Sequence, residues 1–301
     1  MISIDSKITI LMTCYNHQNF VEQAIESVIN QSFRDWHLVI LDDNSNDNST
    51  ELIRKIADKH ENISAIFGNE NLGKAERLNT FLPYLQTPYF AFIDSDDYWV
   101  EDKLKHQVEI FDKENQVDVI YTNGFVFKTT RKNQTPWEYK SNNFFSDIHR
   151  IPSLRTGKLY NELLNGNFIF YSSSIMKTST CGGIKFRNIP LEDWVYWVDI
   201  ASLGLEFKYI DSPLAYYRIH GENAMINSYQ SEKFILNREI VYEEHKKNMP
   251  QDLKAKYCYI LSRGFKKTNK IKRKSYSFEA IKHNPISIKY CLNFLLTQFQ
   301  F

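Results

Sequence analysis

The 301-residue chain is 43% hydrophobic, which is enough to bury one large core or two small ones. Its formal net charge of +1 conceals a basic segment: nine of the 37 basic residues and no acidic residue lie in Lys254–Lys274, leaving 28 basic against 36 acidic residues elsewhere. Neither a bilayer-spanning apolar run nor the paired cysteine spacing of a zinc or redox motif occurs in the sequence. We therefore expect a cytoplasmic protein with reduced cysteines and no secretory signal.

Strand and helix signals alternate through the first third of the chain. Short apolar runs predict strands at residues 8–12, 36–41, 63–67, 89–94 and 117–121. Apolar residues at helical spacing predict helices between these runs, with stripes over residues 21–29, 52–57, 78–85 and 104–111. Strands that alternate with helices build a largely parallel sheet covered by helices on both faces. The pattern therefore predicts an α/β fold.

Polar side chains collect where the first four predicted strands end. The four ends are Thr13-Cys-Tyr-Asn16, Asp42-Asp-Asn-Ser45, Asn69-Glu-Asn-Leu-Gly73 and Asp94-Ser-Asp-Asp97. Ligands of open α/β sheets bind beyond the carboxyl ends of the strands. An aromatic face, carboxylates and a bound metal together suit a nucleotide.

Three carboxylates, Asp94, Asp96 and Asp97, end the most apolar of these runs. Clustered like charges cost free energy unless a cation or a hydrogen-bonding ligand neutralises them. A hard divalent ion, Mg²⁺ or Mn²⁺, is the simplest partner, since such ions bind protein carboxylates together with substrate phosphates. The alternative is a solvated acidic turn, because so short a motif also occurs by chance.

These motifs resemble the inverting family 2 glycosyltransferases of GT-A fold. The resemblance rests on the strand ends above, on Asn71-Leu-Gly73 with Arg77, and on Glu192-Asp193-Trp194 and Tyr217-Arg-Ile-His220 further along. It covers about the first three quarters of the chain. It implies a GT-A sheet, Rossmann-like and mostly parallel, and transfer of a sugar from a nucleotide diphosphate donor to an acceptor hydroxyl with inversion at the anomeric carbon.

The resemblance also implies a metal site. We expect Asp97 to bind Mn²⁺ or Mg²⁺ directly and Asp96 to bind ribose or the metal through water, with Asp94 supporting the loop. His220 is a second candidate ligand, because imidazole suits Mn²⁺ better than Mg²⁺, and Arg218 beside it is a supporting residue. The alternative for His220 is a hydrogen-bonded histidine at a strand end.

The donor nucleotide is assigned to Thr13, Tyr15, Asp43 and Arg77, together with Asp96. Tyr15 can contact a pyrimidine and Asp43 can accept from its N–H, so a UDP-sugar is the preferred donor, with a thymidine or guanosine donor as the alternative. Arg77 and Lys74 can reach phosphate oxygens. For Lys74, a solvated helix face is the competing interpretation.

Inversion by one in-line displacement needs a base that accepts the proton of the acceptor hydroxyl. Asp193 fits this role at the start of a predicted helix, and Glu192 beside it would raise its proton affinity by like-charge coupling. The competing interpretation is that both carboxylates only favour a helix N-terminus electrostatically. The family resemblance favours the base.

We predict three segments: a nucleotide-sugar-binding half at residues 1–124, an acceptor-binding half at 125–230, and a helical basic extension at 231–301. The extension could contact an anionic membrane through residues 254–301, which suits a glycan or lipid-linked acceptor in surface polysaccharide synthesis at the inner face of the membrane. A solvated basic helix is the alternative.

Two other classes of protein remain as alternatives. A metal-dependent sugar-phosphate nucleotidyltransferase would share the aspartate cluster but should carry a Gly-rich basic loop after the first strand, where Thr13-Cys-Tyr-Asn16 has none. A nucleic-acid-binding protein could use Lys254–Lys274, yet no groove-reading motif is present and the acidic remainder would repel phosphates. We therefore expect no nucleic-acid partner.

Overall fold

The computed structural model describes residues 4–128, 142–143, 156–220 and 232–298. The chain divides into two compact units, one of residues 1–188 with 192–221 and the other of residues 189–191 with 222–301. The predicted boundary between residues 230 and 231 lies outside the described residues. The predicted division between residues 124 and 125 stays a prediction.

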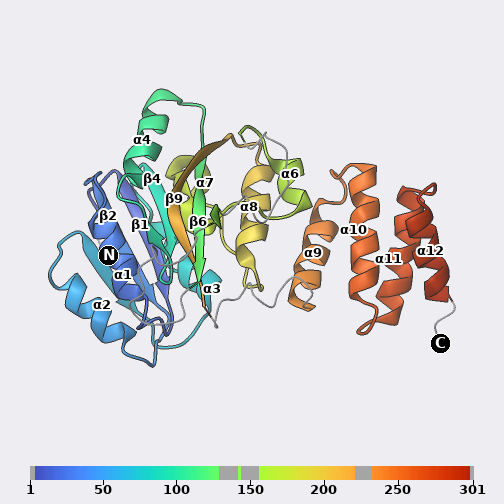
Figure 1. Ribbon diagram of the computed structural model, residues 1–301, viewed down its shortest axis with the longest axis horizontal. Helices are drawn as coiled ribbons and strands as arrows, with labels where there is room; N and C mark the ends of the chain where they lie inside the picture. Colours follow the sequence, from blue (N-terminus) through green and yellow to red (C-terminus); the bar gives the residue numbers. More distant parts are fainter. Residues whose placement is uncertain (1–3, 129–141, 144–155, 221–231, 299–301) are drawn as a thin grey trace. The chain divides into compact units, whose positions relative to one another are not determined.

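The described part of the first unit forms one sheet of nine strands (Figure 1). The strands are β1 (Ile8–Cys14), β2 (Trp36–Asp42), β3 (Ile63–Phe67), β4 (Tyr89–Asp94), β5 (Tyr98–Trp99), β6 (Val119–Lys128), β7 (Asn142–Asn143), β8 (Ile175–Lys177) and β9 (Phe207–Ile219). Their order is β3-β2-β1-β4-β8-β6-β9-β5, with β7 paired to β6. Strands β1 to β4 pair in parallel, whereas β8 is antiparallel to both β4 and β6.

Helices connect these strands as the alternating pattern predicts. They are α1 (Val21–Ile29), α2 (Ser49–Ala57), α3 (Lys74–Asn79), α4 (Lys103–Lys113), α6 (Tyr160–Asn165), α7 (Thr178–Cys181) and α8 (Glu192–Ser202). The predicted stripe over 78–85 is not one helix. It splits into α3 and a 3₁₀ turn at Leu82–Tyr84, because Pro83 lacks the N–H that an α-helix interior needs.

Register places the predicted site residues at one edge of the sheet. Thr13 of β1 lies opposite Leu41 of β2 on one side and Asp94 of β4 on the other. The central strands are apolar and fully buried; every residue of β1 and β2 is buried. Continuous apolar runs of this kind are expected of strands in a parallel sheet that is covered on both faces. The α/β fold predicted from the sequence is confirmed.

The second unit is helical in its described residues, as predicted for the extension. Its helices are α9 (Glu232–His245), α10 (Gln251–Gly264), α11 (Lys270–His283) and α12 (Ile288–Gln298). Asn269 caps α11 by accepting a hydrogen bond from the backbone N–H of Lys272 at 2.9 Å. Buried Asn293 of α12 donates to Ser262 of α10 and Ser277 of α11, which joins three helices. Within the described residues, no helix combines the length and apolarity that crossing a membrane requires.

Candidate active site

The loops that follow β1 and β2 are tied to each other. The backbone N–H of Asn16 donates to Ser45 Oγ at 2.9 Å, and the N–H of Asn46 donates back to Asn16 Oδ1 at the same distance. Asn16 and Asn44 have φ of 56° and 63°, in the left-handed region that asparagine tolerates better than most residues. Thr13, near the end of β1, is buried, whereas Tyr15 in the loop that follows is 43% exposed and accessible to a ligand.

Asp43 and Arg77 form a buried ion pair. Arg77 Nε donates to Asp43 Oδ1 at 2.8 Å, and the Asp43 carboxylate also accepts from the backbone N–H groups of Leu72 and Gly73. Arg77 donates through Nη2 to the carbonyl of Glu70 at 2.7 Å. The pair therefore fixes the loop after β3. Its predicted contacts with donor phosphate and base remain predictions, and in the structure the two side chains bind each other.

The loop after β4 holds the three predicted carboxylates at different depths. Asp97 is 1% exposed, and its carboxylate accepts from Ser172 Oγ at 2.6 Å and from the backbone N–H of Arg218 at 3.1 Å. Burial, together with the charges of Asp96 and Asp94, raises the pKa of Asp97 well above its ordinary value. Asp97 as the direct metal ligand stays a prediction.

Asp96 faces a histidine. Its Oδ2 lies 3.0 Å from Nε2 of His220, at the end of β9. Although burial opposes ionisation, the hydrogen bond from His220 and the nearby His17 hold the pKa of Asp96 below its ordinary value. Arg218 supports this loop, since its Nε donates to the Asp96 carbonyl at 2.7 Å and its guanidinium lies 4.9 Å from the ring centre of Phe20.

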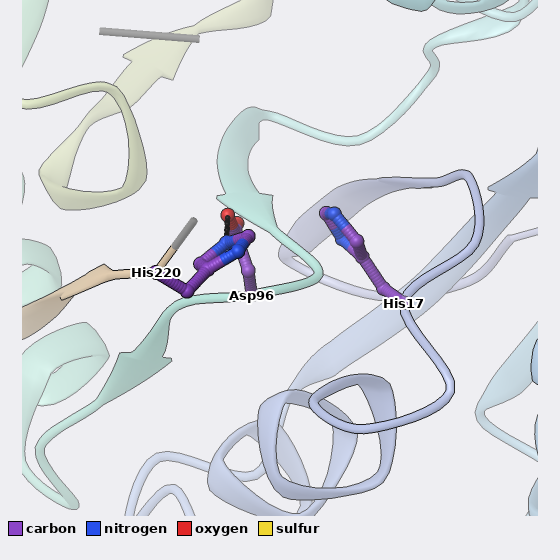
Figure 2. Close-up of side chains that lie close together, drawn as sticks. All are labelled: His17, Asp96 and His220. Atoms are coloured by element: carbon purple, nitrogen blue, oxygen red, sulfur yellow. Dashed lines mark hydrogen bonds and ion pairs between the residues drawn. The ribbon is translucent and has the colours of Figure 1, made fainter. Parts of the chain in front are cut away.

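Two groups of side chains in the described residues of this edge could hold a metal ion. One is Asp94, Asp96 and Asp97, and the other is His17, Asp96 and His220. Figure 2 shows that the residues of the second group come from separate segments of the chain. Within each group the candidate ligand atoms lie within 4.8 Å of one another. Asp96 belongs to both groups. Carboxylate and imidazole donors at this spacing fit a divalent ion such as Mn²⁺.

A second acidic pair, Glu192 and Asp193, begins α8. Lys74 connects it to the loop of residues 94–97, called the aspartate loop below. Lys74 Nζ lies 2.6 Å from Asp94 Oδ1, 3.8 Å from Glu192 Oε1 and 3.6 Å from the ring centre of Tyr171. Burial favours a neutral Lys74, but the carboxylates of Asp94 and Glu192 outweigh it and raise the lysine pKa. Lys74 is therefore a paired cation and does not lie on a solvated helix face.

Asp193 has the proton affinity of a usable base. Burial and the adjacent Glu192 charge raise its pKa to about 6, against the opposing charge of Lys74. Asn167 Nδ2 donates to Asp193 Oδ2 at 2.9 Å, which fixes the orientation of the carboxylate. A general base works best when its pKa lies near the operating pH.

The structure thus gathers most predicted residues into two connected sets. One set joins Asp96, Asp97, Arg218 and His220; the other joins Asp94, Lys74, Glu192 and Asp193, in which Lys74 contacts both Asp94 and Glu192. Asp43 and Arg77 form a separate pair. His17, Asn167 and Ser172 were missed, because a single polar residue in a loop carries no periodicity; only the position of His17 just after the first strand end offered a signal.

A parallel strand edge with a divalent-ion donor set and a nearby carboxyl of raised pKa has the groups that a metal-dependent enzyme acting on a nucleotide substrate needs. Residues 9–179 match the family model described as glycosyl transferase family 2. This is more than half of the chain, so the chain belongs to that family. The match confirms the family resemblance and favours the glycosyltransferase over the alternative classes of protein.

Individual relatives agree with this assignment. The chain is 27% identical over 223 residues to the Escherichia coli UDP-Glc:alpha-D-GlcNAc-diphosphoundecaprenol beta-1,3-glucosyltransferase WfaP, covering 74% of this chain and 81% of that one. Its fold is similar to that of S. aureus TarS 1–349 in complex with UDP-GlcNAc, with a TM-score of 0.61, 17% identity, and coverage of 97% and 79%. It is also similar to the mannosyltransferase PcManGT from Pyrobaculum calidifontis in complex with GDP-Man and Mn²⁺, with a TM-score of 0.54, 15% identity, and coverage of 97% and 79%.

Proposed function

We propose that the chain transfers a sugar from a UDP-sugar, with inversion, to a hydroxyl of a lipid-diphosphate-linked glycan during surface polysaccharide synthesis. The observation that carries the proposal is the pairing of a divalent-ion donor set at Asp96 and His220 with a raised-pKa carboxyl at Asp193. The donor and acceptor classes follow the relative WfaP, whose named substrates are UDP-Glc and a diphosphoundecaprenol-linked GlcNAc. The UDP-GlcNAc complex of TarS supports the same donor class.

In this proposal Asp193 accepts the proton of the acceptor hydroxyl while the oxygen of that hydroxyl attacks the anomeric carbon. The new bond joins the acceptor oxygen to that carbon, and the carbon–oxygen bond to the diphosphate breaks on the opposite face, so the configuration inverts. Asn167 holds the carboxylate of Asp193 in place through its hydrogen bond. A divalent ion, Mn²⁺ or Mg²⁺, held by Asp97, Asp96 and His220, would stabilise charge on the departing diphosphate.

The pH dependence of transfer tests the role of Asp193. Because a protonated carboxyl cannot accept a proton, kcat/KM should fall as pH decreases through about 6, the raised pKa of Asp193, and level off above it. Glu192→Gln removes a charge that raises this pKa, so the acid limb should move to lower pH. Lys74→Met removes a charge that lowers the pKa and should move the limb to higher pH. Shifts of both variants in one direction would contradict the assignment.

Donor specificity is tested by measuring slow hydrolysis of a panel of nucleotide sugars in the presence of Mn²⁺. UDP-sugars should be hydrolysed faster than GDP- or TDP-sugars, and UDP with Mn²⁺ should raise the melting temperature. An oligonucleotide of equal charge is the matched control and should leave the melting temperature unchanged. Stabilisation by the oligonucleotide and none by UDP would remove the proposed function.

We further propose that the second unit contacts the membrane that carries the acceptor. Its last two helices expose large apolar side chains beside many Lys and Arg residues: Ile271, Phe278, Ile288, Leu292, Leu295 and Leu296 are each at least 50% exposed. Leu292, Leu295 and Leu296 share one face of α12 because they are three and four residues apart. Basic residues near such a face attract anionic lipid, by about 1 kcal/mol each.

Vesicle co-sedimentation measures this contact. The protein should bind vesicles that contain anionic lipid at low salt, and binding should weaken as salt screens the charges. Leu292→Glu with Leu296→Glu should reduce binding several-fold, whereas Leu236→Glu on α9, a residue of similar exposure, serves as the control. Equal binding by both variants, or no binding by the unmodified protein, would rule out the membrane contact.

A further inference from the structure

His17 stands at the edge of the aspartate loop without having been assigned a role. It lies in the loop between β1 and α1, while Asp96 follows β4 and His220 follows β9. Figure 2 shows the imidazole of His220 against the Asp96 carboxylate and the imidazole of His17 to one side, on a separate loop. The candidate ligand atoms of the three residues lie within 4.8 Å of one another, and the rings of His17 and His220 are edge to face with centres 5.9 Å apart.

We propose that His17 is a protein ligand of the divalent ion, together with Asp96 and His220, and that this two-imidazole set makes the site prefer Mn²⁺ over Mg²⁺. The inference rests on the proposed function, because it assumes that an ion binds with the donor diphosphate. It deepens that function by naming a further ligand and the selectivity that this ligand confers.

The orientation of His17 supports a ligand role. Its Nδ1 lies 2.7 Å from Oγ of Ser95, which is 1% exposed and belongs to the aspartate loop itself. Metal-binding histidines characteristically use one ring nitrogen for a hydrogen bond that fixes the ring, and the other for the metal. Ser95 therefore leaves Nε2 as the nitrogen of His17 for an ion. Packing alone explains less, since the ring of Phe20 is also 5.9 Å away and meets His17 only by its edge.

The chemistry of the three donors sets the selectivity. Mg²⁺ prefers oxygen ligands and gives up its water reluctantly, whereas imidazole favours first-row transition ions. Two imidazoles and the Asp96 carboxylate would hold the ion beside Asp97, the ligand predicted from the sequence, and diphosphate oxygens and water would complete its coordination. Asp96 is the only carboxylate in this set of three residues. The ratio of Mn²⁺ affinity to Mg²⁺ affinity should therefore be higher than at a site made of oxygen ligands alone.

Pulsed electron paramagnetic resonance of Mn²⁺ bound with UDP tests the ligand directly. The unmodified protein should show nitrogen couplings from two imidazoles, and His17→Ala should show one. Mn²⁺ affinity of His17→Ala should fall by at least about tenfold, the loss that removing an outer-shell partner already causes. Ser95→Ala should lower the affinity less, and His60→Ala, a partly exposed histidine elsewhere in the same unit, is the control.

A second variant measures selectivity. His17→Asp replaces an imidazole with a carboxylate, so the ratio of Mn²⁺ to Mg²⁺ affinity should decrease while UDP still binds. Unchanged nitrogen couplings in His17→Ala would overturn the inference, as would an unchanged affinity ratio in His17→Asp or a loss of UDP affinity without loss of Mn²⁺ affinity. Each of these results leaves the proposed function standing if UDP-sugar transfer is retained, whereas failure of the unmodified protein to bind UDP would remove both.

Discussion

Asp193→Asn should lower the rate of sugar transfer by about 10²- to 10⁴-fold, the usual contribution of a positioned general base. The amide keeps the shape of the carboxylate and can still accept the hydrogen bond that Asn167 donates. What the variant loses is the ability to accept a proton. UDP affinity, measured by calorimetry with Mn²⁺, should therefore stay close to that of the unmodified protein.

Asp199→Asn is the matched control for this variant. Asp199 lies on the same helix, α8, but its carboxylate forms an ion pair with Arg187 at 2.9 Å. It should retain nearly full transfer activity. Near-normal transfer by Asp193→Asn would show that the base lies elsewhere, and equal losses in both variants would point to a damaged helix.

Arg77→Leu should lower the free energy of unfolding by about 3–5 kcal/mol, because it leaves the Asp43 carboxylate buried without its cation. Both side chains are under 10% exposed, so solvent does little to screen the remaining charge. Urea unfolding followed by circular dichroism measures the loss. Asp43→Asn in the same chain should restore part of it, because the double variant has no unpaired charge.

Arg187→Leu is the comparison for the effect of burial. Its ion pair with Asp199 is more exposed, at 33% and 18% of the two side chains, so its removal should cost only about 0–1 kcal/mol. If Arg77 serves only to bind donor phosphate, Arg77→Leu should instead unfold at nearly the same urea concentration and lose UDP affinity.

Much of the fold follows from the sequence, since the first four strands are long, apolar and separated by periodic helices. The strands β8 and β9 are harder to predict for a physical reason. Strand β8 has three residues, too few to show a pattern, and β9 pairs with β6 across register shifts at Asn123 that break its alternation. The prediction of a single helix over residues 78–85 was wrong because it followed the apolar stripe and gave too little weight to Pro83, which interrupts the helix.

The site was predictable as a list of residues but not as a set of partners. Sequence motifs contain the aspartate cluster, Asp193 and His220, so these residues can be found from the sequence alone. The burial of Arg77 against Asp43 is not visible there, because it depends on a loop folding back over the sheet edge. Asn167 and Ser172 could not be predicted for the same reason, since both act through hydrogen bonds to residues far away in the chain.

The hydrogen bond from the backbone N–H of Arg218 to Asp97 spans 121 positions of the chain. The family match ends at residue 179, before β9 begins. The family match therefore does not depend on Arg218 or His220. A relative that matches residues 9–179 but lacks counterparts of Arg218 and His220 would keep the hydrogen bond from Ser172 to Asp97, yet lose those that Arg218 and His220 make with Asp96 and Asp97. When relatives are sorted into active and inactive members, the end of β9 is therefore the segment to inspect.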